Sequence, residues 1–175
     1  MIEKILELRK GGVTRRLHTV PMLGSQTVAQ HSWGVAVLLV QLHPNPSLQL
    51  LKAALWHDVA EAWVGDVPAT AKWRWRPLAH QVAFAELEIE DELGIRVNLT
   101  DKEHQWLNGC DILELALTCY DQLRLGNRNF GVILQRCHNY VAEKQSELPP
   151  VFGTLCSSLW LKAEREQLLE PGDDL

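Results

Sequence analysis

Residues 46–63, PSLQLLKAALWHDVAEAW, place a histidine and an aspartate side by side near the end of an otherwise apolar helical pattern. Leu50 and Ala54 lie four residues apart, on the face that such a helix turns toward a core. His57 and Asp58 are adjacent residues, about 100 degrees apart around the helix axis, so their side chains leave one backbone segment in neighbouring directions. A polar pair in this setting needs a physical explanation.

The rest of the chain shows helical periodicity and no sustained alternation of the strand type, so we predict an all-α fold. Capping-box spacing marks two helix starts, at Thr27 with Gln30 and at Thr100 with Glu103. Asn45-Pro46 suits the start of the helix quoted above, and residues 65–77 are predicted to be a loop. The predicted helices cover residues 2–10, 27–43, 46–63, 77–93, 100–125, 129–145 and 152–169.

Length and charge limit the classes of function. With 175 residues, the chain is predicted to form one compact domain over residues 1–175. A formal net charge of −5 argues against binding to a nucleic-acid polymer or to an anionic membrane. No stretch has the length and apolar character of a signal peptide or a membrane span, so we expect a cytoplasmic protein.

The cysteines and tryptophans have simple structural interpretations. The four cysteines form no CxxC pair and fall within helical patterns, which favours reduced, packed thiols. Most of the seven tryptophans are expected to pack in the core or at an interface. The alternative is that a tryptophan near the histidine–aspartate pair lines a pocket for a nucleobase; the four nearby are Trp56, Trp63, Trp73 and Trp75.

Two further polar residues lie on predicted buried faces. His31 comes three residues after Val28 and four before Val35, and Asp111 comes four residues before Leu115. Taken alone, an inward histidine is more often a hydrogen-bonded core residue than a ligand. An inward carboxylate must be paired, protonated or bound to metal, because its isolated burial is too costly.

Together these side chains have the donor types of one buried metal site. Two imidazoles and two carboxylates suit a divalent ion such as zinc, cobalt, manganese, iron or magnesium, with positions left for water and substrate. The donor types alone do not identify the ion. The four predicted ligands are His31, His57, Asp58 and Asp111.

The order of these residues resembles that of the HD-domain metal-dependent phosphohydrolases. Within that family, the chain is most similar to the 5′-deoxynucleotidase branch, whose pattern includes EHS, HDxxE, GDxPxPxK and a late Asp, and the likeness covers about residues 14–125. Two segments are most similar to the phage-type dATP triphosphohydrolases of this branch: RLHT at residues 16–19 and QTVAQHSWGVA at residues 26–36. The segments that carry the branch likeness are QHSWGVAVL at 30–38, LWHDVAEAWVGDVPATAK at 55–72 and GCDILELAL at 109–117.

The resemblance implies an HD-type helical bundle and a role for each matching residue. His31, His57, Asp58 and Asp111 would hold the metal, with Asp58 also counted as catalytic. Glu61 matches the acidic residue of HDxxE, which would orient the attacking water or accept its proton. The alternative for Glu61 is a solvated carboxylate at a helix end.

The resemblance also implies substrate-binding positions. Arg16 and Lys72 would hold the phosphates, and Asp66 lies in the GDxP turn near the mouth of the site. Lys72 could instead belong to a solvated basic patch with Arg74 and Arg76.

This chain departs from the branch pattern at three positions. Leu17 stands where the branch has Trp, Thr70 replaces the second Pro of GDxPxPxK, and Gln30 replaces the acidic residue before His31. None is an expected ligand, so the departures concern contacts with the base and the sugar. Leu17, Thr19 and Thr70 are therefore candidate pocket residues.

The function implied is hydrolysis of 2′-deoxynucleotides by a metal-activated water, with dATP giving deoxyadenosine and triphosphate. Three alternatives stay open: a 5′-deoxynucleotidase of broad specificity acting on deoxynucleoside monophosphates, a hydrolase of cyclic or signalling nucleotides, and a non-catalytic helical module that binds nucleotides. The partner expected is a small deoxynucleotide. A homo-oligomer, dimer or hexamer, is also expected, and a phage-encoded enzyme would act in the host cytoplasm.

Overall fold

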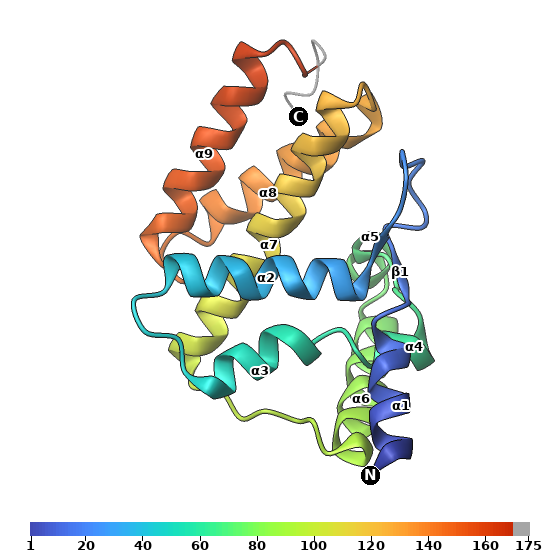
Figure 1. The fold of residues 1–175 in the computed structure, drawn as a ribbon. Coiled ribbons are helices and arrows are strands. Elements are labelled where there is room, and N and C mark those ends of the chain that lie inside the picture. The colour runs from blue at the N-terminus through green and yellow to red at the C-terminus, as the bar shows by residue number, and fades with distance from the viewer. Residues whose placement is uncertain (170–175) are drawn as a thin grey trace.

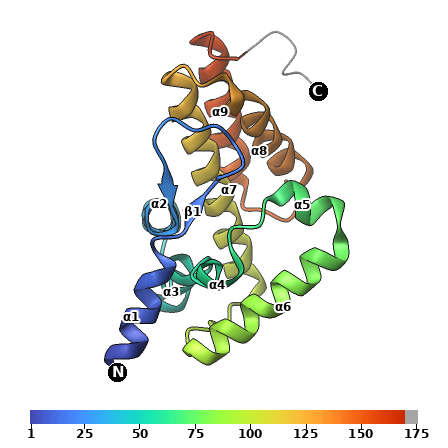
Figure 2. The ribbon, with the colours of Figure 1, turned by 90° about the vertical axis from the view of Figure 1, so that its right-hand side faces the viewer.

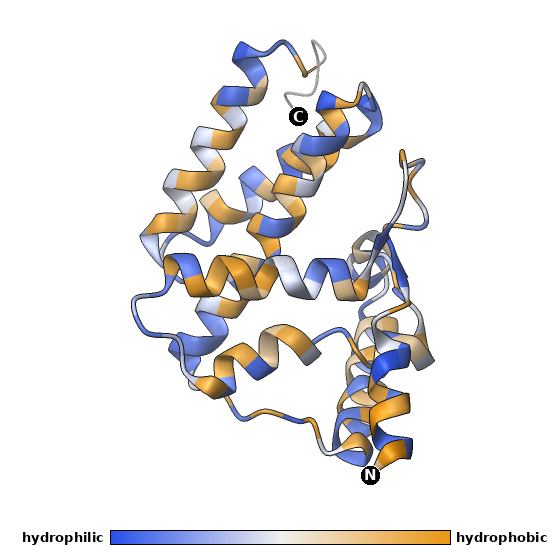
Figure 3. Ribbon diagram, viewed as in Figure 1, coloured by the Kyte–Doolittle hydropathy of each residue, from blue (hydrophilic) through white to orange (hydrophobic). Residues whose placement is uncertain are grey.

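A long helix, α7 (Asp101–Arg124), runs through the centre of the computed structural model, which describes residues 1–169 (Figure 1). Polar and apolar residues alternate along it and its neighbours, as expected for amphipathic helices around a core (Figure 3). The elements that pack against α7 are α2 (Val28–Leu42), α3 (Leu48–Trp56), the short 3-10 helix η1 (Arg128–Phe130), α8 (Gly131–Glu143) and α9 (Pro150–Arg165).

A second group of elements lies beside this bundle (Figure 2). A minimal antiparallel ribbon, in which Arg16 pairs with Gln26, leads from α1 (Ile2–Gly11) into α2. The all-α prediction is confirmed, because this ribbon has only two residues in each strand. The elements of the second group are α1 (Ile2–Gly11), β1 (Arg15–Arg16), β2 (Gln26–Thr27), α4 (Glu61–Val64), α5 (Ala69–Arg74) and α6 (Arg76–Leu93).

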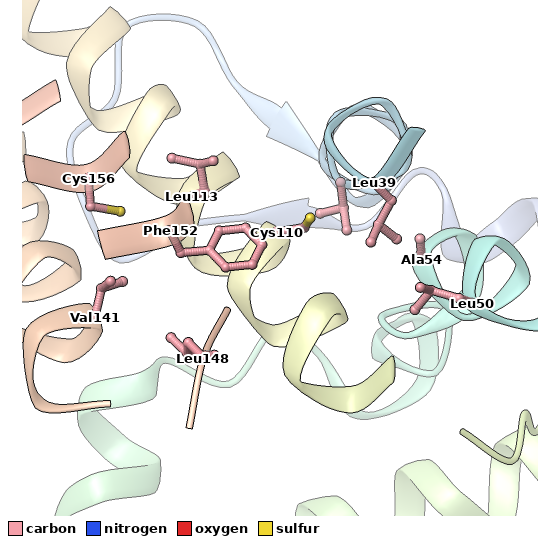
Figure 4. Packing of buried hydrophobic residues seen from close by; sticks show 10 residues of the cluster. Leu39, Leu50, Ala54, Cys110, Leu113, Val141, Leu148, Phe152 and Cys156 are labelled. Carbon is pink, nitrogen blue, oxygen red and sulfur yellow. The ribbon is translucent and has the colours of Figure 1, made fainter. Parts of the chain in front are cut away.

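The main core lies between α2, α3, α7, α8 and α9 (Figure 4). Phe152 of α9 is fully buried and lies directly against Gly109 of α7, and the ring of Trp106 packs edge-on against it with centroids 5.4 Å apart. This contact fixes the part of α7 that comes just before Asp111. The buried members of the core are Val35, Leu39, Leu50, Ala54, Cys110, Leu113, Val141, Leu148, Phe152 and Cys156.

The helix predicted over residues 46–63 is interrupted, and its predicted start is wrong. Ser47, rather than Asn45, caps α3, because its hydroxyl accepts a hydrogen bond from the Leu50 amide at 3.0 Å. The chain then leaves regular helix at residues 57–60 and re-enters it at α4. This turn carries the histidine–aspartate pair.

The loop predicted over residues 65–77 contains α5, so that prediction is wrong in part. The Pro68 carbonyl starts this short helix by accepting hydrogen bonds from the amides of Ala71 and Lys72. Six residues are too few to show a helical period, which is why the sequence pattern misses it. Among residues 1–169, no helix has the length and apolar character that crossing a bilayer requires.

The prediction for the cysteines is confirmed, since all four are free and buried. The tryptophans near the histidine–aspartate pair behave differently. Trp63, Trp73 and Trp75 are exposed by 44%, 58% and 53%, so they do not pack in the core of this chain.

Candidate metal centre and active site

The four predicted ligands meet from three separate segments. His31 lies in the first turn of α2, His57 and Asp58 lie in the turn after α3, and Asp111 lies in the middle of α7. The Nε2 atoms of the two histidines are 3.3 Å apart, and Asp58 Oδ2 is 3.7 Å from His31 Nε2 and 3.4 Å from His57 Nε2. Asp111 lies outside this closest group of three, but its Oδ1 is 3.0 Å from His31 Nε2.

The burial of these residues differs from the sequence prediction in one respect. His31 is completely buried, as predicted, whereas the side chain of Asp111 is about 35% exposed and lies at the rim of the cluster. Asp111 lies on the predicted helix face and reaches His31, although its side chain is not fully buried.

The hydrogen bonds of the two histidines show that the donor set fits a cation. His57 Nδ1 lies 3.0 Å from the Ala54 carbonyl, which can only accept, so Nδ1 carries the proton. His31 Nδ1 contacts the Glu114 carboxylate in the same way. In its neutral form each ring therefore presents the lone pair of Nε2 to the other ring, and His31 Nε2 also faces the carboxylates of Asp58 and Asp111. Such a set of facing acceptors is suited to a divalent ion.

The charges around the cluster shift two pKa values in opposite directions. Burial lowers the pKa of His31, but the hydrogen bonds with Asp111 and Glu114 outweigh this effect and raise the pKa to about 9. The loss of hydration raises the pKa of Asp111, but the hydrogen bond from His31 and the positive charges of the two histidines and Arg16 outweigh it and lower that pKa to about 2. The two shifts are two sides of one contact, because the carboxylates favour a protonated His31 and the protonated ring favours a charged Asp111. A cation bound at this position would take the place of the proton on Nε2.

Glu61 lies beside this cluster and is buried, so the alternative of a solvated helix-end carboxylate is wrong. Its amide donates to the Asp58 carbonyl at 3.1 Å, which places the two residues in one turn. Its Oε2 has no hydrogen-bond partner among residues 1–169. Burial, followed by the negative charge of Asp58, raises the pKa of Glu61 to about 8. A buried carboxylate with a free oxygen and a raised pKa is typical of a proton acceptor in an active site.

Arg16 reaches the centre from strand β1. Its Nη1 contacts Asp58 Oδ2, and its Nε is buried with no hydrogen-bond partner in the part of the chain that the structure describes. Burial lowers the pKa of Arg16, but the negative charges of Asp58 and Asp111 outweigh it and raise that pKa further. Arg16 therefore stays charged and keeps one buried donor, Nε, without a partner among residues 1–169.

Comparison with known proteins agrees with this arrangement. Residues 13–109, more than half of the chain, match the protein family described as HD domain. The chain belongs to the HD-domain family. The matched span includes His31, His57, Asp58 and Glu61 and ends two residues before Asp111. The resemblance noted in the sequence is thereby confirmed.

Two curated relatives and one solved structure are similar to this HD-domain chain. A dATP triphosphohydrolase of Salmonella phage PMBT28 is 33% identical over 79 residues, covering 38% of this chain and 41% of that protein. The chain thus spans about two fifths of the length of the phage protein. A 5′-deoxynucleotidase of Cronobacter sakazakii (strain ATCC BAA-894) is 23% identical over 147 residues, covering 70% of this chain and 73% of that protein.

The solved structure shows the same fold. It is the crystal structure of the PH0347 protein from Pyrococcus horikoshii OT3, with a TM-score of 0.64 and 22% identity. The similarity covers 90% of this chain and 99% of the other, so the helical architecture of the HD-domain chain is shared almost throughout.

The predicted substrate-binding residues of the HD-domain chain differ in burial and in their contacts. Asp66 Oδ2 accepts a hydrogen bond from the Leu17 amide at 2.8 Å and lies 3.6 Å from His18 Nδ1, which joins the GDxP turn to the segment after β1. Leu17 itself has a φ of 55°, an uncommon conformation for a leucine. Thr19 and Thr70 are exposed.

Lys72 is half-buried and lies 3.8 Å from Glu86 Oε1 on α6. The alternative interpretation grouped it with Arg74 and Arg76, which are exposed. The guanidinium of Arg74 lies over the Trp75 ring, 5.4 Å from its centroid. Lys72 therefore differs from its two basic neighbours in burial and faces α6.

Sequence analysis missed several acidic residues around the centre. Glu114 of α7 is buried and contacts His31, whereas Glu86 and Glu90 of α6 are half-buried and lie close enough to feel the charges of Asp58 and His57, respectively. Burial raises the pKa of Glu86 and of Glu90. A usable signal for Glu114 is its spacing of three residues from Asp111, which places both on one face of α7.

Two cavities border the residues of the centre. One of about 350 Å³ is lined by His57, Trp56, Glu90 and His104, together with apolar side chains from α3, α6 and α7. Trp56, one of the four tryptophans near the histidine–aspartate pair, thus lines a pocket. The other, about 580 Å³ and more open, has Gln26, Trp33, Glu114 and Asp121 in its wall.

Proposed function

We propose that this chain is a metal-dependent phosphohydrolase that hydrolyses 2′-deoxynucleotides. The observation that carries the proposal is the convergence of His31, His57, Asp58 and Asp111 next to a buried carboxylate, Glu61, that has a free oxygen. Family membership supports the class of reaction. The names of the two curated relatives support a deoxynucleotide as the substrate.

Each group at the centre has a role in this reaction. A divalent cation bound there would lower the pKa of a water molecule and neutralise charge on the phosphoryl oxygens. His31, His57, Asp58 and Asp111 would hold it, with the imidazoles binding through Nε2. Glu61 would orient the attacking water and, in its ionised form, accept the proton of that water, and its raised pKa makes it a stronger base than an ordinary glutamate.

The cationic residues would bind the phosphates. Arg16 has donors close to the centre and can contact two phosphoryl oxygens at once, whereas Lys72 acts as a single point charge. Substrate binding requires Arg16 to exchange part of its contact with Asp58 for a phosphoryl oxygen. Asp66, which holds the Leu17 amide, would shape the sugar side of the mouth, with Leu17, Thr19 and Thr70 as candidate pocket residues.

The leading substrate is dATP, cleaved between the α-phosphorus and the 5′ oxygen. Water oxygen bonds to phosphorus, the bond from phosphorus to O5′ breaks, and O5′ takes a proton, which yields deoxyadenosine and triphosphate. The name of the phage relative, 33% identical over the matched region, supports this choice.

A 5′-deoxynucleotidase acting on deoxynucleoside monophosphates is the second candidate. It is favoured by the length of the match to the Cronobacter protein, which covers 70% of this chain against 38% for the phage protein. The same residues would cleave the same bond, but the product would be inorganic phosphate. The two candidate enzymes would therefore differ in the space that the site leaves for phosphates beyond the first.

Further parts of the proposal concern the context of the enzyme. We expect the ion to be zinc, cobalt, manganese or magnesium, and the whole span 1–175 to act as one domain. We also expect a homo-oligomer and a cytoplasmic location, in the host if the protein is phage-encoded, because free deoxynucleotides are found there.

The experiment is a substrate panel with the purified protein. Each deoxynucleoside mono- and triphosphate is incubated with Co²⁺, Mn²⁺, Zn²⁺ or Mg²⁺, and inorganic phosphate and triphosphate are separated by ion chromatography. Triphosphate released from dATP supports the first candidate, whereas turnover of monophosphates alone supports the second. Asp111→Ala is expected to abolish either activity. An inactive wild-type protein that still binds nucleotide would instead support the non-catalytic module.

A further inference from the structure

We propose that Glu114 is a positioning residue of the metal centre, which holds the His31 ring so that Nε2 faces the cation. This inference rests on the proposed function only in assuming that a cation binds at His31. It concerns a residue that lies outside the ligand set and outside the span that matches the family. The observation that carries it is the contact of a buried carboxylate with the far nitrogen of the most buried histidine.

The contact between Glu114 and His31 determines which ring nitrogen is free. Glu114 Oε2 contacts Nδ1, and a carboxylate can only accept, so the hydrogen lies on Nδ1. Nε2 is then the atom available as a ligand. His31 is completely buried, and Glu114 is the partner of its Nδ1 in this structure. A carboxylate behind a metal-binding histidine also makes the ring a stronger donor.

Glu114 is itself held in place by two other side chains. Its second oxygen, Oε1, accepts a hydrogen bond from Gln26 Nε2 at 2.9 Å and one from Thr118 Oγ1 at 3.2 Å. Gln26 also donates to Thr118 at 2.9 Å, which closes a triangle of polar groups. One oxygen of Glu114 therefore bonds to His31 and the other bonds to Gln26 and Thr118, so the carboxylate cannot rotate without losing hydrogen bonds.

The backbone of α2 leaves room for this arrangement. Gly34 follows His31 by one helical turn, and a Cβ built on it would lie 2.8 Å from Glu114 Cγ and 3.2 Å from Oε1. Any larger residue at position 34 would push the carboxylate away from α2. The close approach of Glu114 to His31 thus depends on the absence of a side chain at position 34.

Gln26, which holds Glu114, is also linked to Arg16 through the short ribbon. Gln26 lies in strand β2 and is the direct cross-strand partner of Arg16 in strand β1. Arg16 contacts Asp58, whereas Gln26 contacts Glu114. The short ribbon therefore positions both the arginine at the front of the centre and the carboxylate behind it.

The test is metal binding by the apoprotein, measured without substrate. Co²⁺ affinity is determined by competition with a chelator, and the visible absorption of the Co²⁺-loaded protein reports the ligand geometry. The variants are Glu114→Ala, Glu114→Gln and a matched control, Glu164→Gln. Glu164 accepts a hydrogen bond from Trp160 Nε1 at 2.8 Å on α9, so it also holds an aromatic N–H but lies in another helix.

We expect Glu114→Ala to weaken Co²⁺ binding by about 10- to 100-fold and to change the absorption spectrum, because the His31 ring is no longer held. Glu114→Gln retains an acceptor oxygen without the charge, so a smaller loss of affinity is expected. Glu164→Gln should match the wild type in both measurements. Thermal unfolding of each apoprotein shows whether the variant folds.

The inference is overturned if both Glu114 variants bind Co²⁺ with the wild-type affinity and spectrum, or if the wild type does not bind the ion. If Glu114→Ala does not fold, Glu114→Gln and Gly34→Ala decide the question. The proposed function can fail separately. In that case the variants show the expected order of affinities, but no deoxynucleotide is hydrolysed.

Discussion

Replacing Gly109 by alanine should destabilise the protein by forcing α7 and α9 apart. A Cβ at this position would lie 2.3 Å, 2.4 Å and 2.7 Å from three ring atoms of Phe152, far inside ordinary contact distance. Phe152 is fully buried and packed against Trp106, so its ring has no free space to enter. The ring or the helix must therefore shift by about 1 Å within a close-packed core.

The expected size of the effect follows from two opposing contributions. Overpacking of this severity costs about 3 kcal/mol, whereas alanine in a helix interior is favoured over glycine by about 1 kcal/mol. The net loss at Gly109 is therefore about 2 kcal/mol. For a chain of this length that corresponds to a fall in Tm of about 4–8 °C.

The same substitution in the partner helix provides the control. Gly153 lies next to Phe152 in α9, and a Cβ there would have no atom within 4 Å. Gly153→Ala should therefore stabilise the protein by roughly 0.5–1 kcal/mol through helix propensity alone. Differential scanning calorimetry of both variants compares the two signs directly. A Gly109→Ala variant as stable as the wild type, or a Gly153→Ala variant that loses as much stability, would refute the packing argument.

Three further predictions concern the site and its scaffold. Glu61→Gln removes the proposed proton acceptor and should lower kcat by about 10²- to 10⁴-fold. Co²⁺ affinity should be unchanged, and a fully active variant would contradict this role. Removing the cation with a chelator should lower the stability by about 4 kcal/mol relative to protein held at about 1,000 times the Kd of the ion, or about 8–16 °C in Tm. An unchanged Tm would argue against a bound ion. The hydrogen bonds from Ser47 and Thr100 lower the pKa of Glu103 below its ordinary value of 4.5, so their stabilisation is present above that pH and is lost as the pH falls through the folded-state pKa. The Tm difference between wild type and Glu103→Gln should therefore be larger at pH 6 than below pH 4, and a constant difference would contradict the assignment.

The helices that sequence analysis predicted well are those whose signals are local. Thr27 and Thr100 cap α2 and α7 as predicted, each with both hydrogen bonds of the capping box. These contacts join residues three positions apart, so the sequence contains all that is needed to predict them. The helix start at Asn45 was predicted wrongly because Ser47, two residues on, offers a cap that Glu103 of α7 also contacts.

The interruption of the helix at residues 57–60 could not be read from periodicity. The pattern continues through Glu61 without a glycine or proline, yet the backbone turns after α3. The turn directs His57 toward His31 and brings Glu61 beside the cluster. Packing against α2 and α7 therefore overrides the local helical preference at this point.

Glu114 shows the limit of sequence reasoning at the site. In the sequence it is one glutamate in an amphipathic helix, where a carboxylate is ordinarily solvated. Its partners His31 and Gln26 are 83 and 88 residues away in the chain. Nothing within one helical turn of Glu114 distinguishes it from an exposed glutamate, apart from its spacing to Asp111.

The amino-acid sequence by itself determined the helical class and the chemical identity of the metal donors, because helical periodicity and residue type are properties of short segments. The family followed from the order of those donors along the chain. Only the tertiary structure decided that Nε2 of His31 and of His57 face one another, that Arg16 contacts Asp58 and that Glu114 lies behind His31. Each of these depends on how α2, α3 and α7 pack, and that packing is set by long-range burial of apolar surface.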